Sequence, residues 1–214
     1  MRVTNGSGAA ATLVTAILII TGCSGSTEEP AGLAKTAAPQ ATSPTPPEEP
    51  DPTPTSTVPP ALEELRTLEL PPGLVIEDIP DVTGAELAAL DAFVRFEVAH
   101  WQSLLDSEVH DELDDLAADE VVRSVADQVD AQVEEGFHLG GRLVMDPPQV
   151  EAGGSDIAVV IACYNQGEVT VVQGGNEEIG EDAAANPIYR VTADLANSGA
   201  GWIVTDYRGE FDSC

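Results

Sequence analysis

Apolar residues recur at helical spacing after residue 86. They follow one another at steps of three and four positions, which places them on one face of an amphipathic helix: Leu87, Leu90, Val94, Val98, Trp101 and Leu105. Thr83 and Glu86 have the spacing of a capping box, in which hydroxyl and carboxylate satisfy free backbone donors at a helix start. The pattern predicts a long helix that begins after Thr83 and buries one stripe.

A second helical pattern covers residues 119–135. Acidic residues at its start suit the positive end of the helix dipole, and Gly136 is expected to end it. Residues 110–117, between the two helices, are expected to form one or two helical turns. The apolar line predicted for the second helix consists of Val122, Val125, Val129 and Val133.

Beyond Gly136 the apolar period changes to two, which is typical of β-strands. Residues 142–150 predict a strand that bends at Pro147 and Pro148. Residues 156–164 are apolar almost throughout and predict a central strand. Asn165-Gln166-Gly167 is expected to turn this strand into another one at 168–173.

Two further strands follow in the C-terminal part. Apolar and polar residues alternate over 189–195, and a turn at 197–201 leads into the closing strand at 202–211. Helices first and a meander of strands afterwards predict an α+β fold, with the helices on one face of a curved antiparallel sheet.

The N-terminus follows neither pattern. Residues 9–20 form an apolar run that is too short to span about 30 Å of hydrocarbon but suits a signal-peptide core. Ile20-Thr21-Gly22-Cys23 follows at once and resembles the bacterial lipobox, in which the cysteine is acylated. We expect residues 1–22 to be a lipoprotein signal peptide and Cys23 to anchor the chain in the membrane. The alternative is an ordinary signal peptide with a chance cysteine.

A proline-rich segment separates Cys23 from the patterned part of the chain. Residues 23–61 carry ten prolines among Thr, Ser, Ala and Glu, and proline removes backbone donors. We expect a disordered tether that reaches up to about 100 Å at roughly 3 Å per residue. A ligand for a proline-reading partner is the alternative. Residues 62–82 are interpreted as a lead-in and 83–214 as the folded domain.

The charge of the chain restricts its partners. The formal net charge is -30, from 38 acidic and 8 basic residues. Nucleic-acid backbones and anionic lipid headgroups would be repelled, so no nucleic acid is expected and membrane association is assigned to the N-terminus alone. The acidity indicates either solubility or a dedicated acidic binding face.

The order of elements resembles the NTF2-like, or SnoaL-like, cone over residues 83–214. The chain is most similar to small actinobacterial lipoproteins whose last strand begins with a Gly-Trp pair and ends near a terminal cysteine, here Gly201-Trp202 and Cys214. The resemblance implies a concave sheet face that can hold a small molecule between helix and sheet.

Within such a cone, inward-facing Trp202 and Val204 would place Asp206 on the same face by the period of two. The ketosteroid-isomerase branch uses an inward carboxylate as a general base, so Asp206 is a candidate catalytic residue. Arg190 or Arg208 pairing with Asp206 on the outer face is the alternative. Aromatic residues are candidates for the pocket wall or, alternatively, core residues: Trp101, Tyr164, Tyr189 and Trp202.

The remaining cysteines, Cys163 and Cys214, would meet an oxidising compartment. Pairing them would fasten the C-terminus to the central strand; the alternative is two unrelated thiols.

No metal or cofactor is expected, because the chain has no His-x-x-x-His, Cys-x-x-Cys or glycine-rich phosphate loop. No Gly-x-Ser-x-Gly occurs either. We therefore expect a lipid-anchored, extracytoplasmic, non-enzymatic module that binds an envelope protein or a small apolar ligand. The alternative is a small-molecule pocket with weak isomerase- or cyclase-like activity.

Overall fold

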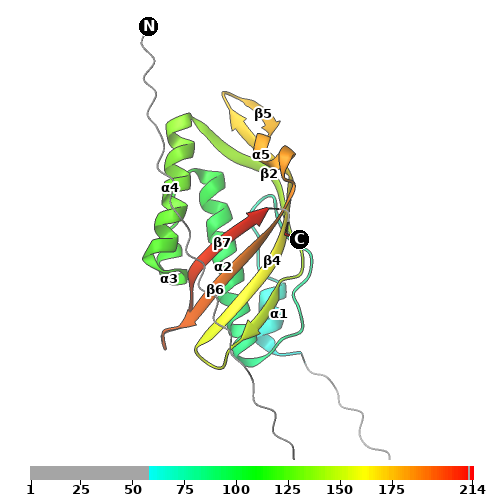
Figure 1. Cartoon of the computed structure of the whole chain (residues 1–214), viewed down its shortest axis with the longest axis vertical. Helices are drawn as coiled ribbons and strands as arrows, with labels where there is room; N and C mark the ends of the chain where they lie inside the picture. Colours follow the sequence, from blue (N-terminus) through cyan, green and yellow to red (C-terminus); the bar gives the residue numbers. More distant parts are fainter. Residues whose placement is uncertain (1–57, 212) are drawn as a thin grey trace, which may run out of the picture. The chain divides into compact units, whose positions relative to one another are not determined.

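A curved, unclosed sheet of seven strands, covered on one face by helices, makes up the part of the chain that the structure describes, residues 58–211, 213 and 214 (Figure 1). The structure is a computed structural model. Its elements in chain order are α1 (Pro60–Arg66), β1 (Leu74–Ile76), α2 (Gly84–Asp106), α3 (Leu113–Leu116), α4 (Asp119–Glu135), β2 (Phe137–Met145), β3 (Gln149–Ala152), β4 (Ile157–Gln173), β5 (Asn176–Ile179), α5 (Glu181–Ala185), β6 (Ile188–Asn197) and β7 (Trp202–Phe211).

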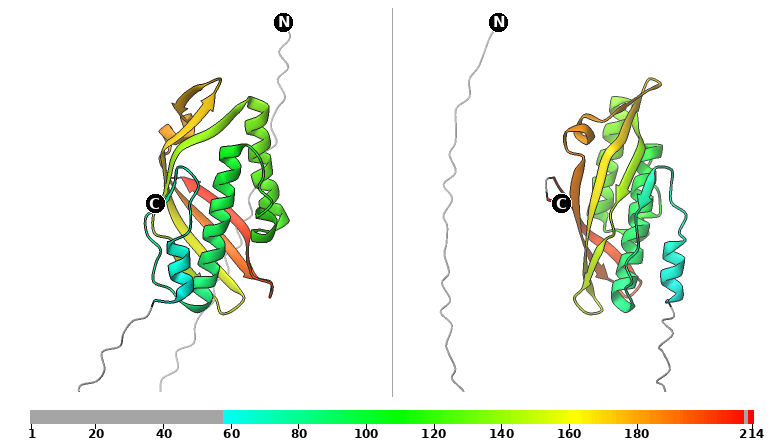
Figure 2. Two further views of the ribbon diagram at one scale, coloured as in Figure 1. Left: turned by 180° about the vertical axis from the view of Figure 1, so that it is seen from behind. Right: turned by 90° about the vertical axis from the view of Figure 1, so that its right-hand side faces the viewer.

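The sheet is built around β4. Its strand order is β1-β2-β4-β6-β7, and β3 and β5 also pair with β4. All pairings are antiparallel except that of β1 with β2. Figure 2 shows α2 and α4 lying against the same face of the sheet. The core lies between this face and the helices, which confirms the α+β prediction.

The two long helices form where the apolar periodicity predicts them. Thr83 is the N-cap of α2, but its side chain makes no capping hydrogen bond, so the capping box itself is not formed. α4 spans the predicted residues and ends at Gly136, which adopts a left-handed conformation with φ 73°. The short α3 lies within the stretch expected to contain one or two helical turns.

The prediction that Val133, at the C-terminal end of α4, belongs to the buried apolar face of this helix is wrong. Val133 is 59% exposed, whereas Val121 and Gln132 are buried together with Val125 and Val129. Successive steps of four residues rotate by about 40° around a helix of 3.6 residues per turn, so the line drifts away from the core. A step of three, from Val129 to Gln132, brings the buried face back into line.

The strands differ from the prediction at two points. The strand expected over 142–150 is divided: β2 ends at Met145, and β3 begins at Gln149 beyond Pro147 and Pro148. The turn expected at 165–167 does not form, because β4 runs continuously through it. The glycine-containing segment instead accompanies a shift in the register between β2 and β4.

Residues before the predicted domain also pack against it. Leu62 and Leu65 of α1 are buried, as are Leu74 of β1 and Ile79. The Arg66 guanidinium donates to the carbonyl of Ile79, 2.9 Å away. The segment expected to be a lead-in therefore contributes to the core, and α1 begins at Pro60, within the segment expected to be a tether.

The predicted signal peptide, Cys23 and the tether up to residue 57 lie outside the described residues. Among the described residues, no helix is both long and apolar enough to cross a membrane.

Candidate functional site

A cavity of about 390 Å³ lies between α2, α4 and the helix-covered face of the sheet. We call it the inner cavity. Side chains from α2, α4, β2, β4, β6 and β7 line it, and most of its wall is apolar or aromatic. Its polar lining includes Glu97 and His100 of α2, Ser124 and Gln128 of α4, and Tyr207 of β7.

Glu97 is the acidic residue of this cavity, and it is only 2% exposed. Its Oε1 atom has no hydrogen-bond partner in the described part of the chain. Burial disfavours the charged carboxylate and raises the pKa of Glu97 from 4.5 to about 7. A buried acid that changes charge near neutral pH is therefore available to whatever enters the cavity.

The tyrosines around Glu97 oppose this effect of burial. The neighbouring hydroxyls of Tyr207 and Tyr164 lower the pKa of Glu97, but by less than burial raises it. No hydrogen bond of ordinary geometry satisfies Glu97 Oε1 or the buried Tyr164 hydroxyl. Burial, and next the charge of Glu97, raise the pKa of both tyrosines well above 10, so their hydroxyls stay protonated.

His100 lies one helical turn beyond Glu97. Burial lowers its pKa to about 4, although the side chain of Gln128 acts in the opposite direction. The imidazole is therefore neutral at pH 7, and its Nε2 atom has no partner among the described residues. The ring centroids of His100 and Tyr207 lie 5.6 Å apart in an edge-to-face arrangement.

A second cavity of about 460 Å³, the outer cavity, adjoins the inner one. The two share four lining residues: His100, Ser124, Gln128 and Tyr207. Ser124 and Gln128 are exposed to solvent. The outer cavity thus lies between α4 and β7, beside the inner cavity that contains Glu97.

Asp206, the candidate catalytic residue, lines the outer cavity but not the inner one. It forms an ion pair with Arg208, which also binds Asp194 at 2.9 Å. Val204 pairs with Leu195, whereas Asp206 pairs with Asp194, so the register shifts by one residue at Thr205. This β-bulge turns Tyr207 rather than Asp206 toward the helices, and the expectation that Val204 and Asp206 share a face is wrong.

The aromatic candidates divide into cavity wall and core. Trp101 and Tyr189 line the inner cavity, and the Trp101 indole donates to the carbonyl of Pro72 over 3.0 Å. Tyr164 is buried and stacks on Tyr189, with ring centroids 5.2 Å apart. Trp202 is a core residue that lines neither cavity.

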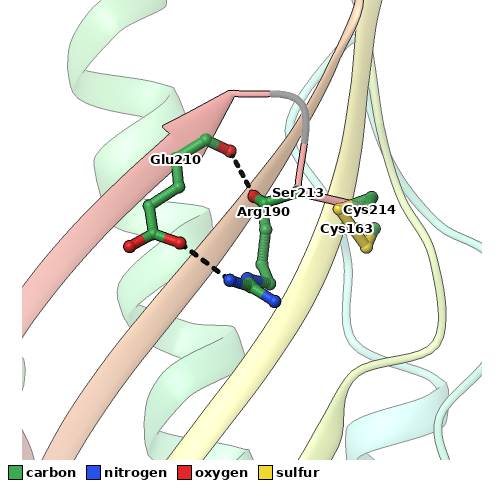
Figure 3. The surroundings of a disulfide bond; sticks show 5 residues. All are labelled: Cys163, Arg190, Glu210, Ser213 and Cys214. Atoms are coloured by element: carbon green, nitrogen blue, oxygen red, sulfur yellow. Dashed lines mark hydrogen bonds and ion pairs between the residues drawn. A yellow bond between two sulfur atoms is a disulfide. The ribbon is translucent and has the colours of Figure 1, made fainter.

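Cys163 and Cys214 form a disulfide, as the sequence indicates, with their Cα atoms 6.0 Å apart (Figure 3). β6 lies between β4, which carries Cys163, and β7, which precedes Cys214. The bond thus joins the C-terminus to β4, which is not the strand next to β7, and so fastens it to the centre of the sheet. Next to it, Arg190 of β6 and Glu210 of β7 form an ion pair of 2.7 Å.

The acidic stretch after Gly175 is divided between a strand and a helix. Part of it forms β5, which pairs with β4, and part forms the short α5. Within the described residues, no group of three or more His, Cys, Asp or Glu side chains is arranged to hold a metal ion.

A larger and more open groove of about 660 Å³ lies between residues 68–72 and the helices α2 and α3. Its basic side chains have partners: Arg95 pairs with Asp91 at 2.9 Å and His110 with Asp106 at 3.0 Å. None of the described residues that line the groove has a buried side-chain atom without a hydrogen-bond partner, unlike Glu97 and His100 of the inner cavity, so we regard the inner cavity as the candidate site.

The sequence patterns missed Glu97 and His100 as site residues. The predicted helix stripe passes through Val94, Val98 and Trp101, but Glu97 lies seven residues after Leu90 and four after Phe93. That spacing places it on the buried face. A charged residue in the middle of an apolar helix face was the signal available in the sequence.

Comparison with known proteins identifies no family. No family model and no curated protein matches the chain. Among solved structures, the crystal structure of the intermembrane space region of chloroplast protein ARC6 aligns with a TM-score of 0.45 and 10% sequence identity. The alignment covers 62% of this chain and 100% of that one. A likeness at this level carries no argument about function.

Proposed function

We propose that this chain is a lipid-anchored protein of the extracytoplasmic membrane face whose NTF2-like domain binds a small molecule in the inner cavity. One observation carries the proposal: the inner cavity contains a buried acid, Glu97, whose Oε1 atom has no hydrogen-bond partner among the described residues. Buried polar groups are nearly always hydrogen-bonded, so those that are not require an explanation.

A bound ligand supplies that explanation. Leaving a polar group buried and unpartnered costs about 1–3 kcal/mol, and more for a charged one. Three such atoms, Glu97 Oε1, His100 Nε2 and the Tyr164 hydroxyl, occur in the region of one cavity. A few convergent polar groups in a mostly apolar cavity of this size are typical of small-molecule sites.

The anchor and the tether support the same function. A lipid on Cys23 of the lipobox-like Ile20-Thr21-Gly22-Cys23 would anchor the chain in the membrane. The proline-rich segment after it would be a long tether between the membrane and the domain. A binding domain held in this way retains its ligand at the cell envelope.

Cavity filling tests the proposal. Gly209 of β7 lines the inner cavity, and a Cβ added there would meet the Tyr189 ring at 3.8 Å, an ordinary contact. Gly209→Leu should therefore fold and occupy the cavity, whereas Gly209→Ala leaves most of it open. The probe is Prodan, a neutral dye whose fluorescence shifts to the blue in an apolar site.

Wild type and Gly209→Ala should produce a saturable blue shift, and Gly209→Leu should weaken it at least tenfold. Equal binding by all three proteins, or no saturable binding by wild type, would rule out the inner cavity as a site. Circular dichroism of the variants controls for folding.

Weak proton-transfer chemistry is the second candidate function. It is favoured by the position of Glu97, whose pKa of about 7 suits a general base, beside the protonated hydroxyls of Tyr164 and Tyr207. The carboxylate would remove the α-proton of a β,γ-unsaturated ketone while a tyrosine hydroxyl donates to the carbonyl oxygen, and the protonated carboxyl would return the proton to the γ-carbon, which gives the conjugated α,β-unsaturated ketone. The conjugated product absorbs in the ultraviolet, and Glu97→Gln should abolish its formation.

A further inference from the structure

The charge pattern of the two cavities narrows the class of ligand. Among the described residues, no lysine or arginine lines the inner or the outer cavity. His100, the one basic side chain that the described part of the chain contributes to them, is buried and neutral at pH 7. Glu97 is thus the group in the inner cavity that becomes charged near neutral pH, and its charge is negative.

The wall next to Glu97 is aromatic. Trp101, Tyr189 and Tyr207 line the inner cavity together with Glu97, and Tyr164 stacks behind Tyr189. Aromatic faces attract cations electrostatically, most strongly where water is excluded. A carboxylate that shares a cavity with aromatic rings therefore offers a cation both an ion pair and cation–π contacts.

The residues at the outer cavity, which adjoins the inner one, also carry negative charge. Glu120 lines the outer cavity and has no ion pair among the described residues. The nearby arginine, Arg208, is shared between the carboxylates of Asp206 and Asp194, which leaves this cluster negative. The chain as a whole carries a formal charge of -30, which raises the local concentration of cations.

From these features we propose that the inner cavity binds a small organic cation, a protonated amine on an apolar body, with its ammonium group against the Glu97 carboxylate. This inference rests on the proposed function and specifies its ligand. An anion would be repelled by Glu97, and a neutral ligand would leave the charge of the ionised carboxylate buried and uncompensated.

The ion pair makes binding depend on pH. An amine binds the ionised carboxylate, so Glu97 releases a proton when the ligand binds below pH 7. The other titratable groups that face Glu97 are His100 on its own helix, Tyr164 of β4, Tyr189 of β6 and Tyr207 of β7. These four stay neutral between pH 5 and 8, and α4 contributes the uncharged Ser124 and Gln128. The affinity for the amine should therefore rise from pH 5 to pH 8.

Four ligands of one shape and different charge test the proposal on the purified full chain: phenethylamine, phenethyl alcohol, benzyl methyl ketone and phenylacetate. Isothermal titration calorimetry should give an affinity for the amine at least tenfold higher than for the alcohol or the ketone at pH 8, and no binding of the acid. Two buffers of different ionisation enthalpy at pH 6 should reveal the released proton.

Glu97→Gln keeps the size of the side chain and removes its charge, so it should reduce the affinity for the amine at least tenfold and leave that for the alcohol unchanged. Glu134→Gln, an exposed substitution on α4 away from both cavities, is the matched control and should bind like wild type. The four-ligand series on wild type decides the question even if Glu97→Gln does not fold.

Equal or tighter binding of the neutral ligands by wild type would overturn the cation proposal. If Prodan binds and is excluded by Gly209→Leu while the amine shows no preference, the ligand class is wrong but the binding function stands. If neither Prodan nor any of the four ligands binds, both proposals fail.

Discussion

Val204 and Asp206 lie two residues apart on β7 but face opposite sides of the sheet. Thr205 is an extra residue in the pairing with β6, where Val204 is opposite Leu195 and Asp206 is opposite Asp194. The Thr205 hydroxyl donates to the carbonyl of Asp194 over 3.0 Å. This single bulge sends Tyr207 toward Glu97 and leaves Asp206 in an ion pair with Arg208.

Deleting Thr205 should therefore leave the faces of β7 unchanged. Without the extra residue, Val204 and Asp206 become neighbours opposite Leu195 and Asp194, and neighbours on a regular strand face opposite sides. The deletion removes the hydrogen bond of the Thr205 hydroxyl to Asp194 and should cost about 1 kcal/mol in the free energy of unfolding.

Thr205→Ala is the matched control for that deletion. It keeps the bulge, loses only the hydrogen bond to Asp194, and should cost about 1 kcal/mol. Urea unfolding followed by circular dichroism measures both variants. A loss of about 3 kcal/mol or more on deletion alone would show that removing Thr205 turns residues of β7 to the wrong face, so that it is not the extra residue.

The pKa of Glu97 predicts a specific dependence of stability on pH. The folded state holds the proton of Glu97 more tightly than the unfolded state, so this stabilisation is complete below pH 4.5 and is lost as the pH rises to about 7. The difference between these two pKa values corresponds to roughly 3 kcal/mol in the free energy of unfolding. Between pH 4.5 and 8, the stability of wild type relative to Glu97→Gln should fall by about this amount.

His100 acts in the opposite sense and serves as an internal reference. Its pKa is lowered from 6.5 to about 4 in the folded state, so its contribution is present above pH 6.5 and is lost as the pH falls to 4. Glu97→Gln retains this loss at low pH. Parallel stability curves for wild type and the variant would contradict the burial of Glu97.

The disulfide should stabilise the domain mainly by restricting the unfolded chain. Cys163 and Cys214 are 51 residues apart, and closing such a loop contributes roughly 3–4 kcal/mol. Protein purified without reductant should show neither of these two residues as a free thiol, and reduction should lower its Tm while helices and strands persist. Cys163→Ala/Cys214→Ala should have the same Tm with and without reductant. Detection of both cysteines as free thiols in native protein would contradict the bond.

Cys23 should determine membrane attachment. Cys23→Ser removes the thiol that takes the lipid and should release the protein from the membrane fraction with its domain folded. Cys214→Ser loses the disulfide but keeps Cys23, so it should remain in the membrane fraction. Cell fractionation and immunoblotting measure both. A Cys23→Ser protein that stays membrane-bound after signal cleavage would refute the lipid anchor.

The sequence by itself determined the local elements and the fold class. Apolar steps of three and four residues specify α2 and α4, Gly136 ends α4, and the alternation over 189–195 and 202–211 predicts β6 and β7. The number of cysteines left after Cys23 also indicated the Cys163–Cys214 bond. These features depend on the chemistry of neighbouring residues or on counting, so a linear pattern contains them.

Only the tertiary structure decided the site. A register shift in one strand reverses the faces of the residues after it, and no pattern in β7 marks Thr205 as the extra residue. The turn signal at 165–167 was likewise overridden, because β4 pairs with neighbouring strands on both sides of this segment. Glu97 is not part of the predicted helix stripe, which consists of apolar residues. Packing of α2 on the sheet buries it nevertheless, and the cost of that burial raises its pKa and gives the cavity its chemistry.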